Sequence, residues 1–374
     1  MRIGYDAKRA FKNFTGLGNY SRAVICIMAD FYPDNNYVLY TPPYKTPVSE
    51  LEHLGNATIK QPKGIWRTLH STWRSLRITK EIIKDKIDIY HGLSHELPVG
   101  IEKAEVKSVV TMHDLIVLRY PHLYKPIDRK IYMKKYRAAC KHADLIVAIS
   151  RQTKEDLINL MGIDESKIRL VYQGCDPQFY TLHGETEKNT VKQKYNLPDK
   201  YILNVGTIEE RKSLAVIVRA LAKLPADVHL VAVGKPTDYM QKVQTEIERY
   251  KLQNRVLFLH NARFTDFPAI YQQAQAFVYP SIFEGFGIPI LEALNSHIPV
   301  VAANTSSLPE VGGDAALYID AGDDNKLAEY LTNILSDENL KQSMIEKGIK
   351  QAAKFREDEI AKALNAVYYE LINL

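Results

Sequence analysis

Residues 276–293 of the chain read AFVYPSIFEGFGIPILEA, and this stretch decides the fold class. Its apolar start, Ala276–Tyr279, predicts a short buried strand. The glycine-rich segment that follows leads into a predicted helix with Pro289 in its first turn, a position that proline favours. A strand, a glycine-rich loop and a helix in this order form the repeating element of a parallel α/β sheet.

The same alternation of β-branched runs and amphipathic stretches recurs along the whole chain. It predicts parallel strands with crossover helices on both faces of each sheet. The expected strands are residues 1–5, 37–40, 87–90, 108–112, 145–149, 201–205, 228–233, 256–258, 276–279, 299–302 and 316–319. The expected helices include residues 19–30, 68–85, 212–224, 238–250, 267–274, 289–295 and 358–373.

The alternation is interrupted once, by the turn-rich stretch GCDPQFYTLHG at residues 174–184. A chain of 374 residues is long enough for two domains of ordinary size. We therefore predict an α/β protein with two Rossmann-like domains, residues 1–178 and 179–355, whose parallel sheets face an interdomain cleft. Residues 356–374 are the candidate for a last helix that packs back on the N-terminal domain.

Composition excludes several broad classes of protein. A chain with 46% hydrophobic and 25% charged residues is neither disordered nor fibrous, and no apolar run is long enough to span a bilayer. The first residues, MRIGYDAKRAF, lack the apolar region of a signal peptide. Cys26, Cys140 and Cys175 are odd in number and lack metal-binding spacing, which predicts a reducing compartment and a cytoplasmic location.

Positive charge gathers in the N-terminal half of the chain. Residues 1–180 hold 28 Lys and Arg against 19 Asp and Glu, whereas the remainder is net acidic. Two stretches concentrate the charge: residues 60–86, which also contain Trp66 and Trp73, and residues 119–142. They are either solvated helix faces or surfaces that attract an anionic membrane or a lipid-phosphate acceptor at the inner membrane face. We expect no nucleic-acid partner.

Chemistry is expected at the carboxyl ends of strands, where loops meet the N-termini of helices. After the first strand, Gly16 and Gly18 open a helix and allow backbone amides to approach an anion. Ser21 stands where a dinucleotide fingerprint needs a third glycine, so an ordinary tight turn also explains this segment.

His113 and Asp114 follow the strand expected at residues 108–112. In one interpretation His113 donates to a ligand while Asp114 fixes its tautomer. In the other, His113 is simply buried and Asp114 caps the next turn.

Arg211 and Lys212 follow the strand expected at residues 201–205 and open a helix. Cations are disfavoured at that end of a helix, so this placement indicates a bound polyanion. A guanidinium beside an ammonium suits two neighbouring phosphoryl groups. The alternative is an exposed basic turn that Glu209 and Glu210 neutralise.

The loop quoted at the start carries the strongest signal. The amides of Gly287 and Ile288 are expected to point at a phosphate at the helix N-terminus. Glu284 precedes this position and Glu292 lies about one turn into the helix, so the two carboxylates are expected to flank an anion. Carboxylates pair with vicinal hydroxyls of a sugar or a ribose. Alternatively, Glu292 is an acid on the helix surface.

Taken together, these residues match a known family. The chain resembles the retaining glycosyltransferases of the GT4 type, which have the GT-B fold, and the resemblance runs nearly end to end. It is carried by TGLGNYSR at 15–22, HDL at 113–115, AISRQTKEDLI at 148–158, NVGTIEERKSL at 204–214, EGFGIPILEA at 284–293 and SSLPEVGGDAALYID at 306–320. Glu210, Ser213 and Gln173 depart from the residues usual in relatives, and this leaves the exact loop shape open.

The resemblance implies roles for the candidate residues. Arg211 and Lys212 would bind the donor diphosphate, and Glu292 would hold the ribose hydroxyls. Glu284 would hold the transferred sugar, whose distal hydroxyls His113 would face. The remaining residues expected to contact the donor are Gly16, Gly18, Gly206, Gly285, Phe286, Gly287 and Ile288.

The resemblance also implies retention of anomeric configuration. No aspartate is followed two places later by another, so the Asp-x-Asp metal motif of many sugar transferases is missing. We expect no metal and no cofactor, with Arg211, Lys212 and the helix N-terminus stabilising the leaving diphosphate.

The motifs look most like those of bacterial mannosyltransferases of surface-polysaccharide assembly. This implies GDP-mannose as donor and a saccharide or lipid-linked acceptor, while UDP-glucose, UDP-galactose and UDP-N-acetylglucosamine stay open. Competing interpretations are a nucleotide-sugar epimerase, a nicotinamide dehydrogenase and a non-catalytic sugar-nucleotide binder. The missing third glycine argues against the dehydrogenase, and the joint presence of Glu284, Arg211, Lys212 and Glu292 argues against a passive binder.

Overall fold

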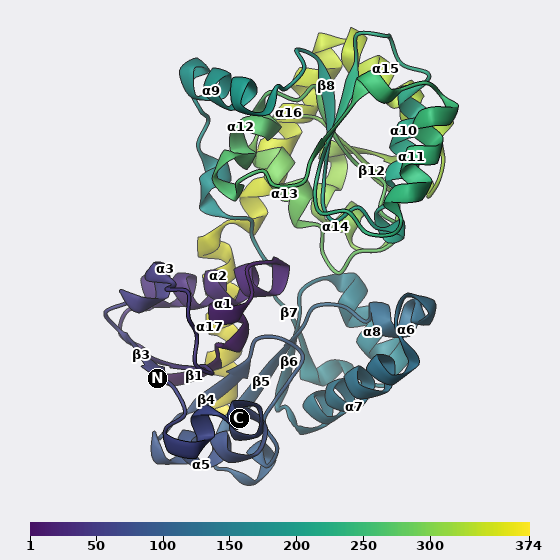
Figure 1. Cartoon of the computed structure of the whole chain (residues 1–374). Coiled ribbons are helices and arrows are strands. Elements are labelled where there is room, and N and C mark those ends of the chain that lie inside the picture. Colours follow the sequence, from purple (N-terminus) through teal and green to yellow (C-terminus); the bar gives the residue numbers. More distant parts are fainter. The chain divides into compact units, whose positions relative to one another are not determined.

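The structure is a computed structural model that describes residues 1–374. The chain divides into two compact units, residues 1–173 together with 356–374, and residues 174–355 (Figure 1). The division after Gln173 lies a few residues before the boundary expected from the sequence. Each unit contains one parallel sheet covered by helices, which confirms the predicted class of two Rossmann-like α/β units.

The first unit is built on a seven-stranded parallel sheet in the order β3-β2-β1-β4-β5-β6-β7. Its strands are β1 (Arg2–Asp6), β2 (Asn36–Tyr40), β3 (Ala57–Lys60), β4 (Ile89–Gly92), β5 (Lys107–Met112), β6 (Leu145–Ala148) and β7 (Ile168–Leu170). The strand order reverses between β1 and β4. In open α/β sheets, ligands bind outside the carboxyl ends of the strands at such a point, so the loops after β1 and β4 are candidate ligand contacts.

Helices cover both faces of this sheet. Those on one face are α2 (Gly16–Phe31) and α17 (Glu357–Asn373), and those on the other are α5 (Ile78–Lys84), α7 (Pro126–His142) and α8 (Arg151–Met161). The shorter helices are α1 (Lys8–Lys12), α3 (Ser49–Glu52), α4 (His70–Thr72) and α6 (Ile116–Arg119). Because both faces are covered, the central strands read as continuous apolar runs rather than alternating ones.

The last helix, α17, belongs to the first unit, where it packs beside α2 and β4. The buried hydroxyl of Tyr368 lies 2.7 Å from Nδ1 of His91 and 3.1 Å from the hydroxyl of Tyr5. Glu370 of the same helix pairs with Arg169. Residues 356–374 therefore complete the N-terminal unit, although the whole second unit separates them from it in the sequence.

The second unit is built on a six-stranded parallel sheet in the order β10-β9-β8-β11-β12-β13. Its strands are β8 (Tyr201–Val205), β9 (His229–Val233), β10 (Val256–Leu259), β11 (Ala276–Tyr279), β12 (Val300–Ala303) and β13 (Ala316–Ile319). Here the order reverses between β8 and β11. The loops after these two strands carry Arg211, Lys212 and Glu284, so they meet where a ligand is expected.

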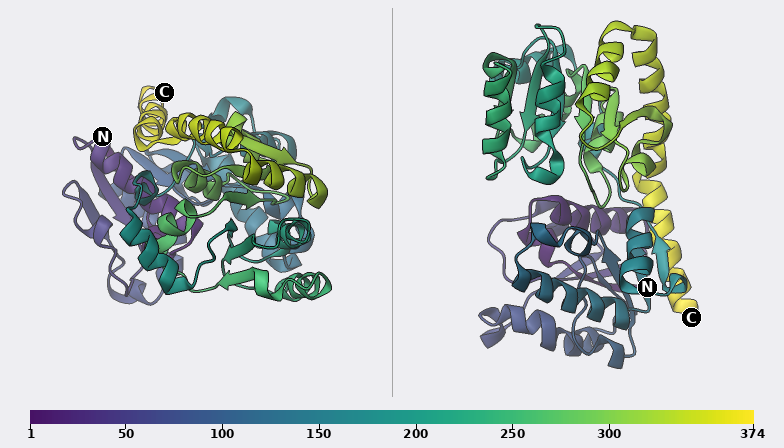
Figure 2. Two further views of the ribbon diagram at one scale, coloured as in Figure 1. Left: turned by 90° about the horizontal axis from the view of Figure 1, so that it is seen from above. Right: turned by 90° about the vertical axis from the view of Figure 1, so that its right-hand side faces the viewer.

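Both faces of the second sheet are covered as well (Figure 2). The helices of this unit are α10 (Leu214–Leu221), α11 (Met240–Arg249) and α15 (Asp324–Ser336) on one face, α12 (Phe267–Gln272), α13 (Ile288–Asn295), α14 (Leu308–Gly312) and α16 (Glu338–Ala352) on the other, and α9 (Glu185–Tyr195) beside α12. All residues of α10 except Arg219 are apolar and buried, because α11 and α15 flank this helix against the sheet.

Two parts of the first unit differ from the expectation. The helix expected at residues 68–85 is present as one unbroken helical stretch from His70 to Lys84, but it contains an unpredicted π-helical turn at Trp73–Arg77 between α4 and α5. The wider turn lets Trp73 and Arg74 both reach the interior, where Trp73 donates to Glu81 at 2.7 Å. The strands β3 and β7 were not expected, since each is a short edge strand without a continuous apolar run.

Candidate active site

The loop after β8 places the two neighbouring cations. Gly206 ends the strand with a φ of +145°, and a Cβ there would lie 3.3 Å from Cε of Lys212. The chain then forms a 3-10 turn at Glu210–Lys212 and enters α10 through Ser213, which has a φ of +54°. Glycine at position 206 therefore leaves room for the Lys212 stem at the carboxyl end of the sheet.

The loop after β11 is held against this turn by backbone and hydroxyl contacts. The amide of Ile282 donates to the carbonyl of Arg211 at 2.9 Å. Three hydroxyl residues after β12, Thr305, Ser306 and Ser307, support the loop from its other side. The amide of Glu284 donates to Ser306 Oγ at 2.9 Å, and Ser307 Oγ donates to the carbonyl of Glu284 at 3.0 Å.

Glu284 joins the two cations. Its Oε1 lies 2.8 Å from Nη1 of Arg211 and 2.7 Å from Nζ of Lys212, and all three side chains are largely buried. Arg211 also donates to the carbonyl of Phe283 at 2.5 Å and to Glu209 at 2.5 Å, and Lys212 donates to the hydroxyl of Tyr279. The alternative of an exposed basic turn is therefore wrong in its exposure, since both cations are largely buried, although the expected pairing of Glu209 with Arg211 is present.

Opposing effects set the ionisation of Glu284. Burial alone raises its pKa, but the adjacent Lys212 and Arg211 outweigh burial and lower the pKa to about 2. The carboxyl is therefore ionised at neutral pH. Two cations and two carboxylates, Glu284 and Glu209, therefore balance in formal charge, and an anionic ligand would bind by competing with these carboxylates for Arg211 and Lys212.

Glu292 lies in the interior of α13 and is only 6% exposed, so the alternative of a surface acid is wrong. Its Oε2 accepts a hydrogen bond from the hydroxyl of Tyr271 at 2.7 Å. Burial raises the pKa of Glu292 to about 7, and Asp176 adds to the rise, while the Tyr271 hydrogen bond opposes it. The pKa values of the two carboxyls in the glycine-rich segment are thus shifted in opposite directions.

Between these carboxyls, Gly287 turns the chain into α13 with a φ of +126°. A Cβ at this position would lie 3.1 Å from Cδ2 of Leu308, so the close packing of α14 also favours glycine. The amides of Gly287 and Ile288 make no hydrogen bond within the chain. Gly285 and Phe286 lie in the same loop, whose Phe286 carbonyl accepts from Ser307 at 2.5 Å.

The remaining predicted site residues belong to the first unit. α2 begins at Gly16, and a Cβ on Gly18 would lie 1.7 Å from the carbonyl oxygen of Asn13, so this glycine is required by close chain packing. His113 is buried, and its Nε2 donates to the carbonyl of Leu93 at 2.9 Å. That carbonyl fixes the tautomer of His113, while Asp114 accepts the amide of Ile116 at 3.1 Å.

The basic stretches are only partly free at the surface. Trp73 is fully buried, so the expectation that it lines a surface with Trp66 is wrong. Arg74 pairs with Asp6 at 3.0 Å and with Glu96, and Arg119 pairs with the buried Asp156. Part of the positive charge of residues 60–86 and 119–142 is therefore neutralised by ion pairs with acidic residues of the same unit.

No group of three or more His, Cys, Asp or Glu side chains is arranged to hold a metal ion. The absence of a metal requirement stays a prediction. None of the helices is both long enough and apolar enough to cross a membrane.

Comparison with known proteins agrees with this geometry. The family described as "Glycosyltransferase Family 4" matches residues 34–179, and the one described as "Glycosyl transferases group 1" matches residues 185–351. O-antigen chain mannosyltransferase B of Escherichia coli is 32% identical over 291 residues, which cover 76% of this chain and 74% of that protein. The serotype-specific mannosyltransferase WbdA of the same species is 28% identical over 274 residues, and the match spans only 34% of its length.

The fold is also that of solved glycosyltransferases. The Anabaena protein Alr3699/HepE, solved in complex with UDP and glucose, has a TM-score of 0.77 at 19% identity, with 99% of this chain and 100% of that chain covered. Two parallel α/β units, each matched by a glycosyltransferase family, identify a glycosyltransferase of the GT-B fold. The chain belongs to the family 4 glycosyltransferases and is similar to O-antigen mannosyltransferases.

Proposed function

We propose that the chain transfers mannose from GDP-mannose to a saccharide or lipid-linked acceptor in cell-surface glycan synthesis, with retention of configuration and without a metal ion. The observation that carries this proposal is the cluster in which Arg211 and Lys212 bracket the Glu284 carboxylate. The similarity to O-antigen mannosyltransferases supports mannose as the transferred sugar.

In this proposal the diphosphate of the donor binds Arg211, Lys212 and the amides that open α13. As the bond between the sugar C1 and the phosphate oxygen breaks, these groups stabilise the negative charge that develops on the leaving diphosphate. A new bond forms between C1 and the acceptor oxygen, and the acceptor's hydroxyl proton passes to the leaving phosphate oxygen. The ionised Glu284 binds hydroxyls of the sugar, and Glu292 binds those of the ribose.

A UDP-hexose donor is the second candidate. It is favoured by the structural similarity to Alr3699/HepE, which was solved with UDP and glucose, although at 19% identity that similarity concerns the fold. The groups described in the second unit recognise a diphosphate and hydroxyls, which both donors share. The choice between guanine and uracil therefore depends on residues outside the cluster.

A screen of thermal stability tests the donor. The purified protein is heated with GDP-mannose, UDP-glucose, UDP-galactose, UDP-N-acetylglucosamine or NAD, with and without EDTA. A ligand at 100 times its Kd adds about 2.7 kcal/mol of stability. We expect GDP-mannose to raise the melting temperature equally in EDTA, and turnover to need no added metal. A shift with NAD alone contradicts the proposed function, and loss of the shift in EDTA contradicts metal independence.

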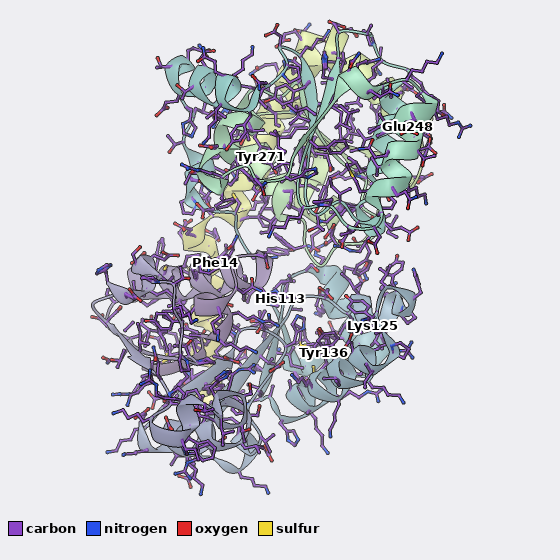
Figure 3. The ribbon with its side chains drawn as sticks, viewed as in Figure 1. Phe14, His113, Lys125, Tyr136, Glu248 and Tyr271 are labelled. Carbon is purple, nitrogen blue, oxygen red and sulfur yellow. The ribbon has the colours of Figure 1, made fainter.

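We also propose that the protein works at the inner face of a membrane, with the basic surface of α7 toward anionic lipid. Lys130 and Lys134 are exposed one turn apart, and so are Ile127 and Ile131, which are 67% and 48% exposed. Lysines beside exposed apolar side chains on one helix suit a lipid surface. Lys125 precedes this helix (Figure 3).

Flotation with vesicles tests the membrane proposal. We expect the wild-type chain to float with phosphatidylglycerol-containing vesicles at low salt and not with phosphatidylcholine alone. Lys130→Glu combined with Lys134→Glu should abolish flotation. Lys347→Glu, which changes an exposed lysine of the second unit, should not. Absence of wild-type flotation at low salt contradicts the proposal.

A further inference from the structure

The loop after β4 contains a buried histidine that makes no hydrogen bond through its ring. His95 is 6% exposed, and its Nδ1 is buried without a partner. The other two buried histidines at this end of the sheet are satisfied, since His91 bonds Tyr368 and Thr111 and His113 bonds the Leu93 carbonyl. Buried polar atoms in native proteins are nearly always paired, so the unpaired ring needs an explanation.

The backbone of His95 is held in an uncommon conformation. Its φ is +60°, in the left-handed region, which is uncommon outside glycine although histidine, asparagine and aspartate adopt it more often than other residues. The His95 amide donates to the carbonyl of Thr111 on β5 at 2.9 Å. The loop also folds back on Gly92, where a Cβ would lie only 2.1 Å from the Glu96 carbonyl oxygen. A residue held in a strained conformation by its surroundings is typical of ligand-binding sites.

An ion-pair network fixes the far end of the same loop. Glu96 accepts from Lys135 of α7 at 2.9 Å and also pairs with Arg74. Arg74 pairs in turn with Asp6, the last residue of β1. These contacts hold the loop against β1, β5 and α7. The ring nitrogens of His95 contribute nothing to holding it there.

Four aromatic rings meet at this loop. The His95 ring stacks on Tyr136 of α7 with centroids 4.5 Å apart and an interplanar angle of 13°. The ring of His113 lies 5.1 Å from that of His95, and Tyr20 packs edge-on against His113 at 4.5 Å. His113 and Tyr136 can be located in Figure 3. The rings lie beyond the carboxyl ends of β4 and β5, next to the reversal of strand order.

The rings of His95 and His113 are uncharged, so they contact a ligand through hydrogen bonds rather than through ion pairs. Burial lowers the pKa of His95 and of His113 to about 3, so each ring is neutral at physiological pH. The Nε2 proton of His113 goes to the Leu93 carbonyl, which leaves Nδ1 as a hydrogen-bond acceptor. A neutral imidazole with an unused nitrogen suits an uncharged partner that donates hydrogen bonds, such as a hydroxyl group.

We propose that His95 binds a hydroxyl group of the saccharide acceptor, while the neighbouring His113 faces the transferred sugar. This rests on the proposed function and adds a residue that holds the second substrate. The cations suited to a diphosphate lie in the other unit, whereas this loop presents neutral acceptors and the ring of Tyr136.

The rival explanation is that His95 merely packs against Tyr136. Two substitutions separate the explanations. His95→Phe keeps a ring for stacking but removes both nitrogens. His95→Asn keeps a polar acceptor and suits the left-handed backbone, in which asparagine is enriched. His122→Phe replaces an exposed histidine of the same unit and serves as the control.

The first measurement is NMR of the full chain with 13C-labelled histidine, in which the His95 ring signal is assigned from the spectrum of His95→Phe. The probes are n-octyl α-D-mannopyranoside, β-D-glucopyranoside and β-D-galactopyranoside. We expect at least one probe to shift the His95 signal. We expect His95→Phe to weaken binding of that probe at least tenfold, His95→Asn to weaken it less and His122→Phe to leave it unchanged. A His95 signal that no probe shifts overturns the proposal.

The second measurement uses GDP-mannose as donor and the bound probe as acceptor. We expect His95→Phe to raise the acceptor KM much more than it lowers kcat, with a melting temperature close to that of the wild type. A large drop in melting temperature with unchanged probe affinity assigns His95 to packing and overturns the proposal. Probe binding without any transfer by the wild-type chain contradicts the proposed function instead, and leaves the role of His95 supported.

Discussion

The Oε1 atom of Glu284 lies 2.7 Å from Nζ of Lys212. The carboxylate expected to bind the transferred sugar is therefore paired with an ammonium group expected to bind the donor diphosphate. The same oxygen lies 2.8 Å from Arg211. A bound diphosphate would compete with this carboxylate for both cations. Donor binding and the orientation of Glu284 should therefore be coupled.

Glu284→Gln should separate these two roles. The neutral amide competes less for Lys212 and Arg211, so we expect GDP to bind more tightly, by about fivefold, or about 1 kcal/mol. Transfer should nevertheless fall about 100-fold or more, because a charged contact to the sugar is lost. Calorimetry with GDP and a turnover assay measure both effects.

Glu210→Gln is the control for this experiment, because Glu210 is exposed and faces Lys242 at 3.6 Å, away from Glu284. It should change neither quantity by more than twofold. Weaker GDP binding by Glu284→Gln than by the wild type would show that the carboxylate supports the diphosphate site rather than competing with it.

Lys212→Met should remove the ammonium while keeping an unbranched stem beside Gly206. We expect kcat to fall by about 100- to 1,000-fold, because a preorganised charge that faces the developing diphosphate is lost. GDP affinity should fall as well. Lys242→Met, at an exposed lysine, is the control. Circular dichroism should show an intact fold. Near-normal turnover of Lys212→Met would contradict the assignment of Lys212 to the donor site.

Glu292 predicts a pH dependence of folding stability. Burial raises its folded-state pKa to about 7, so between about pH 4.5 and 7 the folded chain keeps a proton that the unfolded chain releases. Stability from this group is therefore fully present below about pH 4.5 and is lost as the pH rises toward 7. The full loss is on the order of 3 kcal/mol.

Glu292→Gln keeps an oxygen for the Tyr271 hydroxyl and removes the titration. Urea unfolding at pH 5 and pH 8 should show a larger loss of stability for the wild type than for this variant. Glu284 does not interfere, because its pKa is lowered to about 2 and its contribution is lost only at more acidic pH. Equal losses in the two proteins would mean that Glu292 ionises normally in the folded state.

The sequence alone is sufficient to predict the strands that carry the site and the residues that follow them. Gly206 and Arg211 follow the buried apolar run of β8, and Glu284 follows that of β11; such runs can be recognised from the local sequence pattern. The contact between Arg211 and Glu284 is different. It depends on β8 and β11 being neighbours, and strand order arises from long-range packing that leaves no local signal.

Other features of the site could not be predicted from the sequence because they belong to no periodic pattern. Ser306 and Ser307 support the Glu284 loop through their hydroxyls, but small polar residues in a loop are common without such a role. His95 stands in a short turn and belongs to no spaced motif. Trp73 lies among basic residues that indicate a surface, yet it is buried in an apolar cluster with Tyr40 and Tyr90, a long-range contact that the local sequence does not reveal.

Gly16 and Gly18 provide a final test, because the same motif contains one glycine that packing requires and one that it does not. A Cβ on Gly18 would lie 1.7 Å from the Asn13 carbonyl oxygen, whereas a Cβ on Gly16 would meet nothing within 4 Å. We expect Gly18→Ala to lower the free energy of unfolding by about 1–3 kcal/mol, since the Asn13 backbone must move. Gly16→Ala should change stability by less than about 0.5 kcal/mol.

Urea unfolding of the three proteins measures these differences, and donor affinity should then be compared in variants that are folded. If Gly16→Ala weakens GDP-mannose binding while leaving stability unchanged, the missing side chain at Gly16 leaves space for the donor. If neither property changes, the expected donor contact at Gly16 is wrong.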